Sequence, residues 1–243
     1  MADFASAGSP VRYIAQIAPA REVTLLGTAD MAFWSERLRE AGLHPTRVDG
    51  KAEVVLSAVG ARYKGIGFRE FSVSAFVCRR EGGPDRDAVY LAGAFNTSRF
   101  FAFVERTVFR TPYLHGSVSV DPGPPASFGV AGAGGAWLRA RMAPGGTPEA
   151  RVPVRAAEEG WEGPLFLPGP APGRYFFARV AGFTRAYPFD PSADEVALNP
   201  PPGDEALRWL ADSRFSGREW IVRESATHAR SGTFRRGRGS PFP

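Results

Sequence analysis

The sequence predicts a mainly β protein of the α+β class, with an antiparallel β-barrel or cone and a few helices packed outside it. Two observations support this fold class. The 243 residues include 28 glycines and 22 prolines, which favour many turns and short strands over long helices. Residues 68–78 alternate between two faces over their whole length, as a strand with one face on a core does. A hydrophobic content of 44% is ample for one packed domain of this length.

The N-terminal part predicts two strands separated by a helix. Residues 22–26 and 52–58 are short apolar or alternating runs, which favour strands. Between them, Asp30 can accept a backbone N–H at the start of a helix over 31–41, and a glycine follows that helix. We therefore expect residues 1–20 to form an N-terminal arm ahead of the first strand.

A further strand, helix and strand are expected around residue 100. The apolar run 90–95 predicts a buried strand, and Ser98 is one of three neighbouring residues that can cap a helix over 98–109. Pro112 cannot continue that helix and biases the residue before it towards an extended conformation. Residues 115–120 then alternate as a strand.

The C-terminal part predicts short strands and one helix, joined by loops that are rich in glycine and proline. The expected helix is 204–211, and the expected strands are 128–130, 136–142, 162–167, 174–187 and 219–227. Because no internal repeat or clean boundary divides the chain, we expect a single domain over 21–231. Residues 232–243 are expected to be a disordered basic tail, since four arginines gather near this end: Arg230, Arg235, Arg236 and Arg238.

Composition argues against several classes of function. The single cysteine excludes an internal disulfide, and the three histidines lack partners at metal-ligand spacing, so no metal is expected. No dinucleotide fingerprint or phosphate loop occurs, so no cofactor is expected. The net charge of only +5 does not favour nucleic-acid binding. No apolar run is long enough to span a membrane, and no signal peptide is evident, so a cytoplasmic protein is expected.

Three segments, in order along the chain, resemble the acetoacetate decarboxylase superfamily. The family's Arg-Glu strand and Thr-Asp-Met helix start are similar to residues 21–38, REVTLLGTADMAFWSERL. Its Gly-Leu-Gly entry to an active-site glutamate is similar to residues 65–70, GIGFRE. Arg106 and Pro112 keep the family's spacing between a helix-ending arginine and a proline, and WEGPL at 161–165 is a weaker match. The resemblance implies the family's barrel, a lyase ancestry and a homo-oligomer.

The residue that defines the family's activity is absent. The family has two lysines directly after the proline, and one of them forms a Schiff base with a ketone. Here these positions hold Tyr113 and Leu114. Tyrosine cannot form an imine, so decarboxylation by that route is not expected. The chain has only Lys51 and Lys64 as lysines; Lys64 stands in an expected turn, where a surface position competes with the role of a relocated amine.

The resemblance places an arginine and a glutamate of the family's pocket on Arg21 and Glu70. An arginine recognises a carboxylate in two-point geometry, and a glutamate in an apolar lumen can transfer protons near neutral pH. On the alternating strand, Glu70 shares a face with Phe68 and with the small polar Ser72, as expected for a lumen with room for a ligand. The alternative for Arg21 and Glu70 is a structural ion pair between neighbouring strands.

The candidate catalytic residues are Glu70, Tyr113 and His115. Tyr113 can donate a hydrogen bond to a carbonyl or enolate, and His115 shares its strand face because strand residues two apart point the same way. The candidate substrate-binding residues are Arg21, Phe68, Ser72 and Leu114. A core position for Tyr113 and a surface position for His115 are the alternatives.

We therefore expect a protein that binds a small carbonyl or carboxylate metabolite inside its barrel. One possibility is an enzyme of secondary metabolism, a dehydratase, cyclase or isomerase that uses no Schiff base. The other is a noncatalytic binder of a small apolar metabolite. A polar cluster around Glu70 favours the enzyme, and a purely apolar lumen favours the binder. The phenylalanines of the 98–109 helix spread around more than one stripe, which also favours a homo-oligomer.

Overall fold

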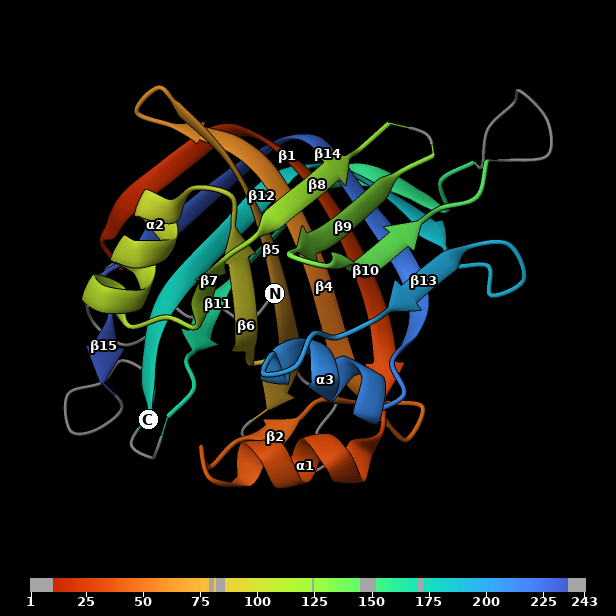
Figure 1. The fold of residues 1–243 in the computed structure, drawn as a ribbon, viewed down its shortest axis with the longest axis horizontal. Coiled ribbons are helices and arrows are strands. Elements are labelled where there is room, and N and C mark those ends of the chain that lie inside the picture. Colours follow the sequence, from red (N-terminus) through yellow and green to blue (C-terminus); the bar gives the residue numbers. More distant parts are fainter. Residues whose placement is uncertain are drawn as a thin grey trace.

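The computed structural model describes residues 11–78, 81, 86–123, 125–144, 152–169 and 173–235. Within them, a large sheet of 11 strands curls into a ring, and a second sheet of 4 strands lies across its outer face (Figure 1). The ring strands are β1 (Tyr13–Ala29), β4 (Lys51–Tyr63), β5 (Ile66–Cys78), β6 (Ala88–Asn96), β11 (Arg155–Phe166), β12 (Arg174–Pro188) and β14 (Ser216–Ser231). Short strands extend this sheet: β2 (His44–Pro45), β3 (Arg47–Val48), β7 (Tyr113–His115) and β15 (Phe234–Arg235).

Strand β6 closes the ring. It pairs antiparallel with β5 along eight residue pairs, but it pairs parallel with β11 through only Leu165–Val89 and Phe166–Tyr90. The ring is otherwise antiparallel, in the order β5, β4, β1, β14, β12 and β11. The protein is therefore mainly β with a barrel-like ring, as the sequence predicted, and its narrow parallel closure makes the sheet a mixed one.

The two faces of the ring strands carry different residues. On β5, Phe71 and Val73 point outward into the main hydrophobic core, whereas Ser72 and Ser74 line the interior. The same alternation separates Leu56 from Ser57 on β4. This division follows from the period of two along a strand, and it places these serines on the interior face of the ring.

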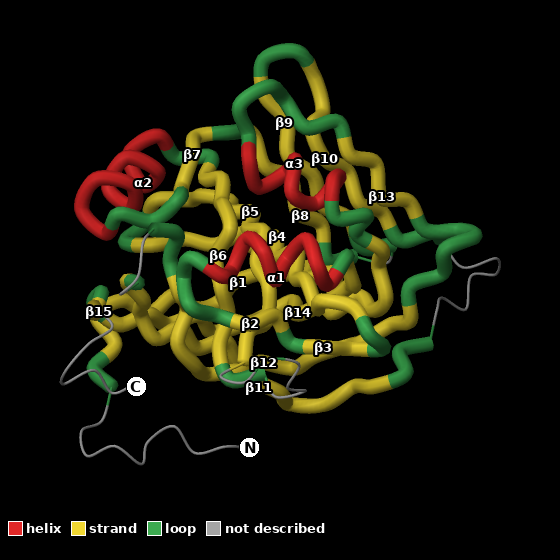
Figure 2. The backbone as a smooth tube through the Cα atoms, turned by 90° about the horizontal axis from the view of Figure 1, so that it is seen from below, coloured by secondary structure: helices red, strands yellow, loops and turns green. Residues whose placement is uncertain are grey.

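The outer core lies beneath the small sheet and two helices. That sheet consists of β8 (Ser117–Asp121), β9 (Ser127–Gly132), β10 (Gly135–Arg141) and β13 (Glu195–Leu198), and the helices are α1 (Met31–Arg39) and α3 (Glu205–Asp212). Figure 2 shows the small sheet and α3 on one side of the ring, with β11 and β12 on the other. Trp34 and Leu38 bury the inner face of α1, and Gly93 of β6 lets Ala206 of α3 approach, because an added Cβ would lie 2.5 Å from the alanine Cβ.

The expected helix over 98–109 consists of two parts. Ser98 caps the α-helix α2 (Arg99–Val104), and a π-helical turn, η1 (Glu105–Phe109), continues it. The π-turn ends at Arg110, which adopts a left-handed conformation with φ of 53°. Such π-helical segments are frequent at functional sites, and this one carries Glu105 to the rim of the ring interior.

Strands β1, β12 and β14 change register at the same level of the ring. Pairing between β1 and β14 shifts on either side of the Ala20–Ala226 pair, and pairing between β12 and β14 shifts after Gly182–Ala226. Gly182 has φ of 157° and lies so close to β14 that an added Cβ would come within 2.9 Å of the Ser225 carbonyl oxygen. The irregularity changes which residues of β14 face the interior. Ile221 and Arg223 line the interior before it, and His228 and Arg230 line the interior after it.

Parts of both ends of the chain pair with strands of the large sheet. Residues 13–20, assigned to the arm, form the first half of β1 and pair with β14. Phe234–Arg235, assigned to the tail, pair with β12, and the rest of the tail lies outside the described residues. Arg230, counted among the arginines that gather near the C-terminal end, belongs to β14. None of the described helices is both long enough and apolar enough to cross a membrane.

Candidate functional site

The ring encloses a cavity of about 990 Å³, here called the barrel cavity. Every ring strand contributes side chains to its wall. The strand registers arrange these side chains in levels, with Glu70 of β5 at one end and Phe76 of the same strand towards the other. The end that contains Glu70, Tyr113 and Glu105 is called the acid end below.

Glu70 is the central group of the acid end. Its carboxylate accepts a hydrogen bond from Asn96 Nδ2 at 2.7 Å and another from the Tyr113 hydroxyl at 3.2 Å. Burial raises the pKa of Glu70, and the negative charge of Glu105 adds to this effect. The two hydrogen bonds and the charge of His228 oppose it, and the pKa rises from 4.5 to about 7. A carboxyl group with this pKa exchanges protons readily at neutral pH.

Glu105 and Arg230 form an ion pair beside Glu70. Arg230 Nη1 donates to both oxygens of Glu105, with 2.7 Å to Oε2, and Thr111 Oγ1 donates to the same oxygen at 2.9 Å. The Arg230 guanidinium lies 4.3 Å from the ring centre of Phe109 and 4.2 Å from that of Phe176. Its Nε and Nη2 are buried without a hydrogen-bond partner among the described residues. The arginine is therefore held by one carboxylate and two aromatic faces.

The Tyr113 hydroxyl is affected by the charges of both Glu70 and Glu105. Burial raises the pKa of its hydroxyl well above the usual 10, and the charges of Glu70 and Glu105 raise it further. The hydroxyl therefore stays protonated at neutral pH. Since it already donates to Glu70, it can offer the same proton to an oxygen of a ligand placed beside that carboxylate.

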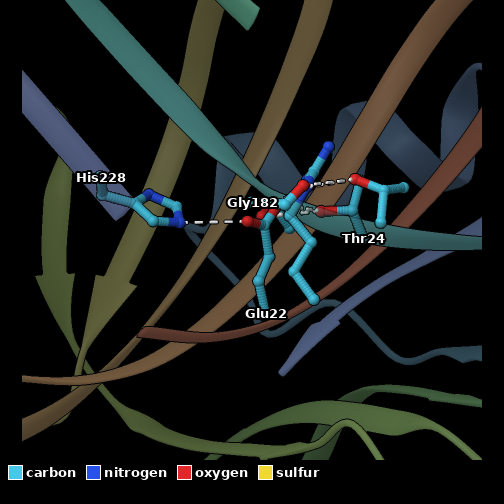
Figure 3. A network of polar contacts seen from close by, with 7 residues as sticks. Glu22, Thr24, Gly182 and His228 are labelled. Carbon is cyan, nitrogen blue, oxygen red and sulfur yellow. Dashed lines mark hydrogen bonds and ion pairs between the residues drawn. The ribbon is translucent and has the colours of Figure 1, made fainter. Parts of the chain in front are cut away.

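A second buried carboxylate, Glu22, lies farther along the wall (Figure 3). Its oxygens accept hydrogen bonds from Arg223 Nη1 at 3.0 Å and from Thr24 Oγ1 at 2.8 Å, and His228 Nε2 lies 3.0 Å away. Burial of the Glu22 carboxyl disfavours its charged form, but the hydrogen bond and charge of His228 and the charge of Arg223 outweigh it and lower its pKa to about 2. Glu22 is thus ionised at neutral pH and accepts hydrogen bonds that position its neighbours.

Two arginines mark the opposite end of the cavity from Glu70. Arg86 donates to the Glu53 carboxylate at 2.7 and 2.6 Å, and Arg218 donates to it at 2.8 Å. Glu53 is fully buried, whereas both arginines line the cavity and are more than one-third exposed. This pair is called the arginine rim below.

The structure brings three of the sequence-predicted site residues together. Glu70, Ser72 and Tyr113 all line the barrel cavity. Phe68 belongs to the same face of β5 but lies buried near the end of the strand, where its ring packs on Phe101 at 5.2 Å. It is not among the residues that line the cavity.

Three other candidates lie outside the cavity. Arg21 is exposed, because it points to the opposite side of β1 from Glu22, and the arginine that faces Glu22 is Arg223. The expected Arg21–Glu70 pair therefore does not form. Leu114 and His115 are exposed as well, since β7 is only three residues long and its end has already left the cavity wall.

Sequence reasoning missed most of the polar residues of the site. The additional residues that line the cavity are Glu22, Glu105, Arg223, His228 and Arg230, and buried Asn96 donates to Glu70 without lining it. The resemblance placed the pocket arginine on Arg21. Glu22, the next residue along β1, points to the other face of the strand and lines the cavity instead. Nothing in the sequence signalled His228 or Arg230, because the register irregularity in β14 decides which of its residues face inward.

The described cavity wall has no lysine amine and no cluster of metal-ligand side chains. Both lysines of the chain are exposed and neither lines the cavity. Among the described residues, no group of three or more histidine, cysteine, aspartate or glutamate side chains is placed to hold a metal ion. The chemistry that the described wall offers is proton transfer and hydrogen bonding.

Comparison with solved structures identifies this architecture. The chain superimposes on the enduracididine biosynthesis enzyme MppR with a TM-score of 0.61 and 12% identity, covering 97% of this chain and 94% of that one. It has the acetoacetate decarboxylase-like fold. A structure of acetoacetate decarboxylase matches with a TM-score of 0.57 at 13% identity, over 90% of this chain and 88% of the other.

A third match agrees with the other two. An acetoacetate decarboxylase-like enzyme from Sphingomonas wittichii RW1 gives a TM-score of 0.54 at 16% identity, over 90% of this chain and 92% of that one. No family model matches the sequence, and no curated protein does. The likeness therefore lies in the fold, while the site of this chain has to be understood from its own residues.

Proposed function

We propose that the protein is an enzyme that binds a carbonyl compound in the barrel cavity and moves a proton on it through Glu70. The observation that carries this proposal is the pKa of about 7 on a carboxyl group that lines a large cavity beside a protonated tyrosine. Such a group lowers the stability of the folded protein at neutral pH, because burial without a compensating cation disfavours its ionised form. Carboxyl groups with strongly shifted pKa values are therefore more typical of functional sites than of purely structural ones. The reaction class is a lyase-type dehydration, cyclisation or isomerisation.

The geometry supports abstraction of a proton next to a carbonyl group. Ionised Glu70 would take the proton, the C–H electron pair would form a C=C bond, and the π electrons of the C=O bond would move onto the oxygen to form an enolate. The Tyr113 hydroxyl would donate a hydrogen bond to that oxygen and stabilise the developing charge. Protonated Glu70 would then return the proton to the same carbon or to a different one.

The proposal includes no Schiff base. Tyr113 and Leu114 occupy the positions of the family's lysines, and Lys51 and Lys64 are exposed outside the cavity. Borohydride reduction in the presence of acetoacetate should therefore trap no adduct on either lysine. A reduced ketone adduct found on Lys51 or Lys64 by mass spectrometry would contradict this.

One neighbour supports a carbonyl-derived ligand. MppR was solved with the condensation product of pyruvate and imidazole 4-carboxaldehyde. A noncatalytic binding protein for an apolar metabolite is the second candidate function, and the apolar residues Leu26, Val89 and Ile221 in the cavity wall favour it. The polar cluster around Glu70 favours the enzyme.

We also propose that the protein forms a homo-oligomer through the surface around α2. Phe100, Phe103 and Val108 are 63, 57 and 67% exposed, which is unusual for large apolar side chains that lie so close together. Light scattering at micromolar concentration should give a multiple of the 26.2 kDa chain mass. A monomer mass would reject this proposal without affecting the site.

Exchange of carbon-bound hydrogen for deuterium tests the enzyme proposal without a known substrate. In D₂O, the protein should accelerate loss of the α-proton NMR signals of butan-2-one above the buffer rate. Glu70→Gln should reduce this acceleration by about 10²–10⁴-fold, because the amide cannot exchange a proton. Glu224→Gln, which alters an exposed ion pair with Arg185, is the matched control. Absence of exchange in the wild-type protein, or equal exchange in Glu70→Gln, would defeat the proposal.

A further inference from the structure

The barrel cavity is much longer than its acid end. Ser74 lies four positions along β5 from Glu70, and Phe76 lies six positions away on the same face, so the wall extends roughly 20 Å from Glu70 at the ordinary rise of a strand. A volume of about 990 Å³ lies at the upper end of the range for sites that hold drug-sized ligands. A four-carbon keto acid would fill only a small part of this space.

The wall changes character in steps along this length. Small hydroxyl side chains follow the acid end, among them Thr24, Ser57 and Ser72. Beyond them is an apolar belt, defined here by Leu26, Val55, Phe76, Val89 and Ile221. The arginine rim follows at the far end, where Arg86 lies 4.8 Å from the ring centre of Phe76.

The belt residues come from five different ring strands and pack against one another inside the ring. They are separate from the main core, which lies on the outer face of the same sheet. Interior side chains that only filled the ring would leave no open volume beside them, yet all five line the cavity. The belt therefore offers an apolar surface to a ligand.

The acid end favours an uncharged head group. Arg223 donates to Glu22 and Thr184, and Arg230 donates to Glu105 through Nη1. The Nε and Nη2 of Arg230, which have no partner among the described residues, are buried and do not face open space. An added carboxylate would therefore meet the charges of Glu22 and Glu105 without an exposed, unpaired guanidinium nitrogen of Arg230 in return. A ketone oxygen needs only the Tyr113 hydroxyl or the protonated form of Glu70.

We infer that the ligand of this cavity is an extended, largely apolar ketone, whose carbonyl group lies at Glu70 and Tyr113 and whose hydrocarbon chain lies along the apolar belt. This inference rests on the proposed function for the position of the head group. It adds the substrate class, because it requires a chain that reaches past Ser74, roughly 13 Å along the strand from Glu70.

A series of alkan-2-ones from butan-2-one to undecan-2-one tests the inference by titration calorimetry on the wild-type protein. Burial of one methylene group favours binding by an amount equal to about a fourfold change in affinity. The dissociation constant should therefore fall by about fourfold for each added methylene over most of the series. An affinity that stays flat after the first members would overturn the inference.

A variant that fills the belt locates the chain. Val55→Trp should weaken binding of undecan-2-one by at least tenfold and leave butan-2-one binding unchanged, since the short ketone does not reach Val55. Ile14→Trp is the matched control, because Ile14 is 50% exposed and lies outside the cavity wall. Equal losses in both variants would show that long ketones bind elsewhere on the surface, and would reject the inference.

The head group is tested separately with Glu70→Gln and Tyr113→Phe. If the carbonyl group lies at the acid end, Tyr113→Phe should weaken every member of the series by a similar factor. A chain-length dependence that persists while both variants bind all ketones normally would keep the apolar belt as a binding surface and reject the acid end as the head-group site. Absence of binding for the whole series would reject both.

Discussion

Glu22 and Glu70 face the same cavity but have opposite electrostatic character. The pKa of Glu22 is lowered to about 2, and that of Glu70 is raised to about 7, although both side chains lie in the wall of one barrel. The difference lies in their partners. Glu22 faces Arg223 and His228, whereas the hydrogen-bond partners of Glu70 among the described residues are the neutral donors Asn96 and Tyr113.

The comparison separates architecture from chemistry within one site. Burial disfavours the charged form of both carboxylates. At Glu22 the paired cations offset this effect, whereas at Glu70 the two neutral hydrogen bonds and the charge of His228 offset it only in part. Glu105 adds a like charge near Glu70 instead. Glu22 should therefore be important for stability, and Glu70 should be important for proton transfer.

The largest expected effect on stability is that of Glu22→Gln. The substitution leaves the Arg223 guanidinium, whose side chain is only 8% exposed, without its counter-charge. Loss of one partner of a buried ion pair costs about 3–5 kcal/mol, and urea unfolding at pH 7 should show a decrease of this size. The control is Glu162→Gln, because Glu162 and Arg179 form an exposed pair 3.8 Å apart. Similar small decreases in the free energy of unfolding in both variants would contradict a structural role for Glu22.

The next effect is a pH dependence with a defined sign. The pKa of Glu70 is raised in the folded state, so from about pH 4.5 to about pH 7 the unfolded chain ionises this group more readily. Glu70 therefore costs stability as the pH rises through this window, by about 3 kcal/mol in total. Glu70→Gln should remove that decline, so that the variant gains relative to the wild type between pH 5 and pH 8.

Glu22 contributes with the opposite sign and in a different window. Its folded pKa of about 2 lies below the ordinary 4.5, so its stabilisation is complete above pH 4.5 and is lost as the pH falls towards 2. The two windows do not overlap. Unfolding free energies measured for both variants from pH 3 to pH 8 should therefore assign each slope to one residue, and a slope at pH 5–7 that survives Glu70→Gln would contradict the account.

A smaller effect is expected for Tyr113→Phe. The hydroxyl stabilises ionised Glu70, so its removal should raise the pKa of Glu70 above 7 and cost about 1–2 kcal/mol at pH 8. At pH 5, where Glu70 is protonated, the cost should be lower. Tyr63→Phe is the control, because Tyr63 does not line the cavity. A loss that is the same at both pH values would indicate that Tyr113 acts only through packing.

The sequence predicted the face of β5 correctly because this strand is long and regular. An unbroken period of two placed Glu70, Ser72 and Ser74 on one side, and the structure puts all three in the cavity wall. The same reasoning failed for His115, which was expected to share the face of Tyr113 but lies outside the cavity wall, since a strand of three residues is too short for its facing to persist. The absence of the family's lysines was visible directly.

The polar cluster on β1 and β14 could not be derived in this way. Ala15 and Ile17 face the cavity at odd positions of β1, whereas Glu22 faces it at an even position. The register shifts on either side of Ala20 account for this change. Pairing partners and bulges of this kind depend on distant strands, so Arg21 was selected in place of Glu22, and Arg230 was counted only among the arginines that gather near the C-terminal end.

The pKa of Glu70 tests the central claim most directly. Carbon-13 NMR of protein labelled at the glutamate carboxyl carbons, titrated from pH 3 to pH 9, can follow this group, and the signal absent from Glu70→Gln assigns it. We predict a midpoint near 7, with Glu22 still ionised at the acidic end of the titration. A Glu70 midpoint at or below the ordinary 4.5 would contradict its role in proton transfer and leave it as part of the barrel wall.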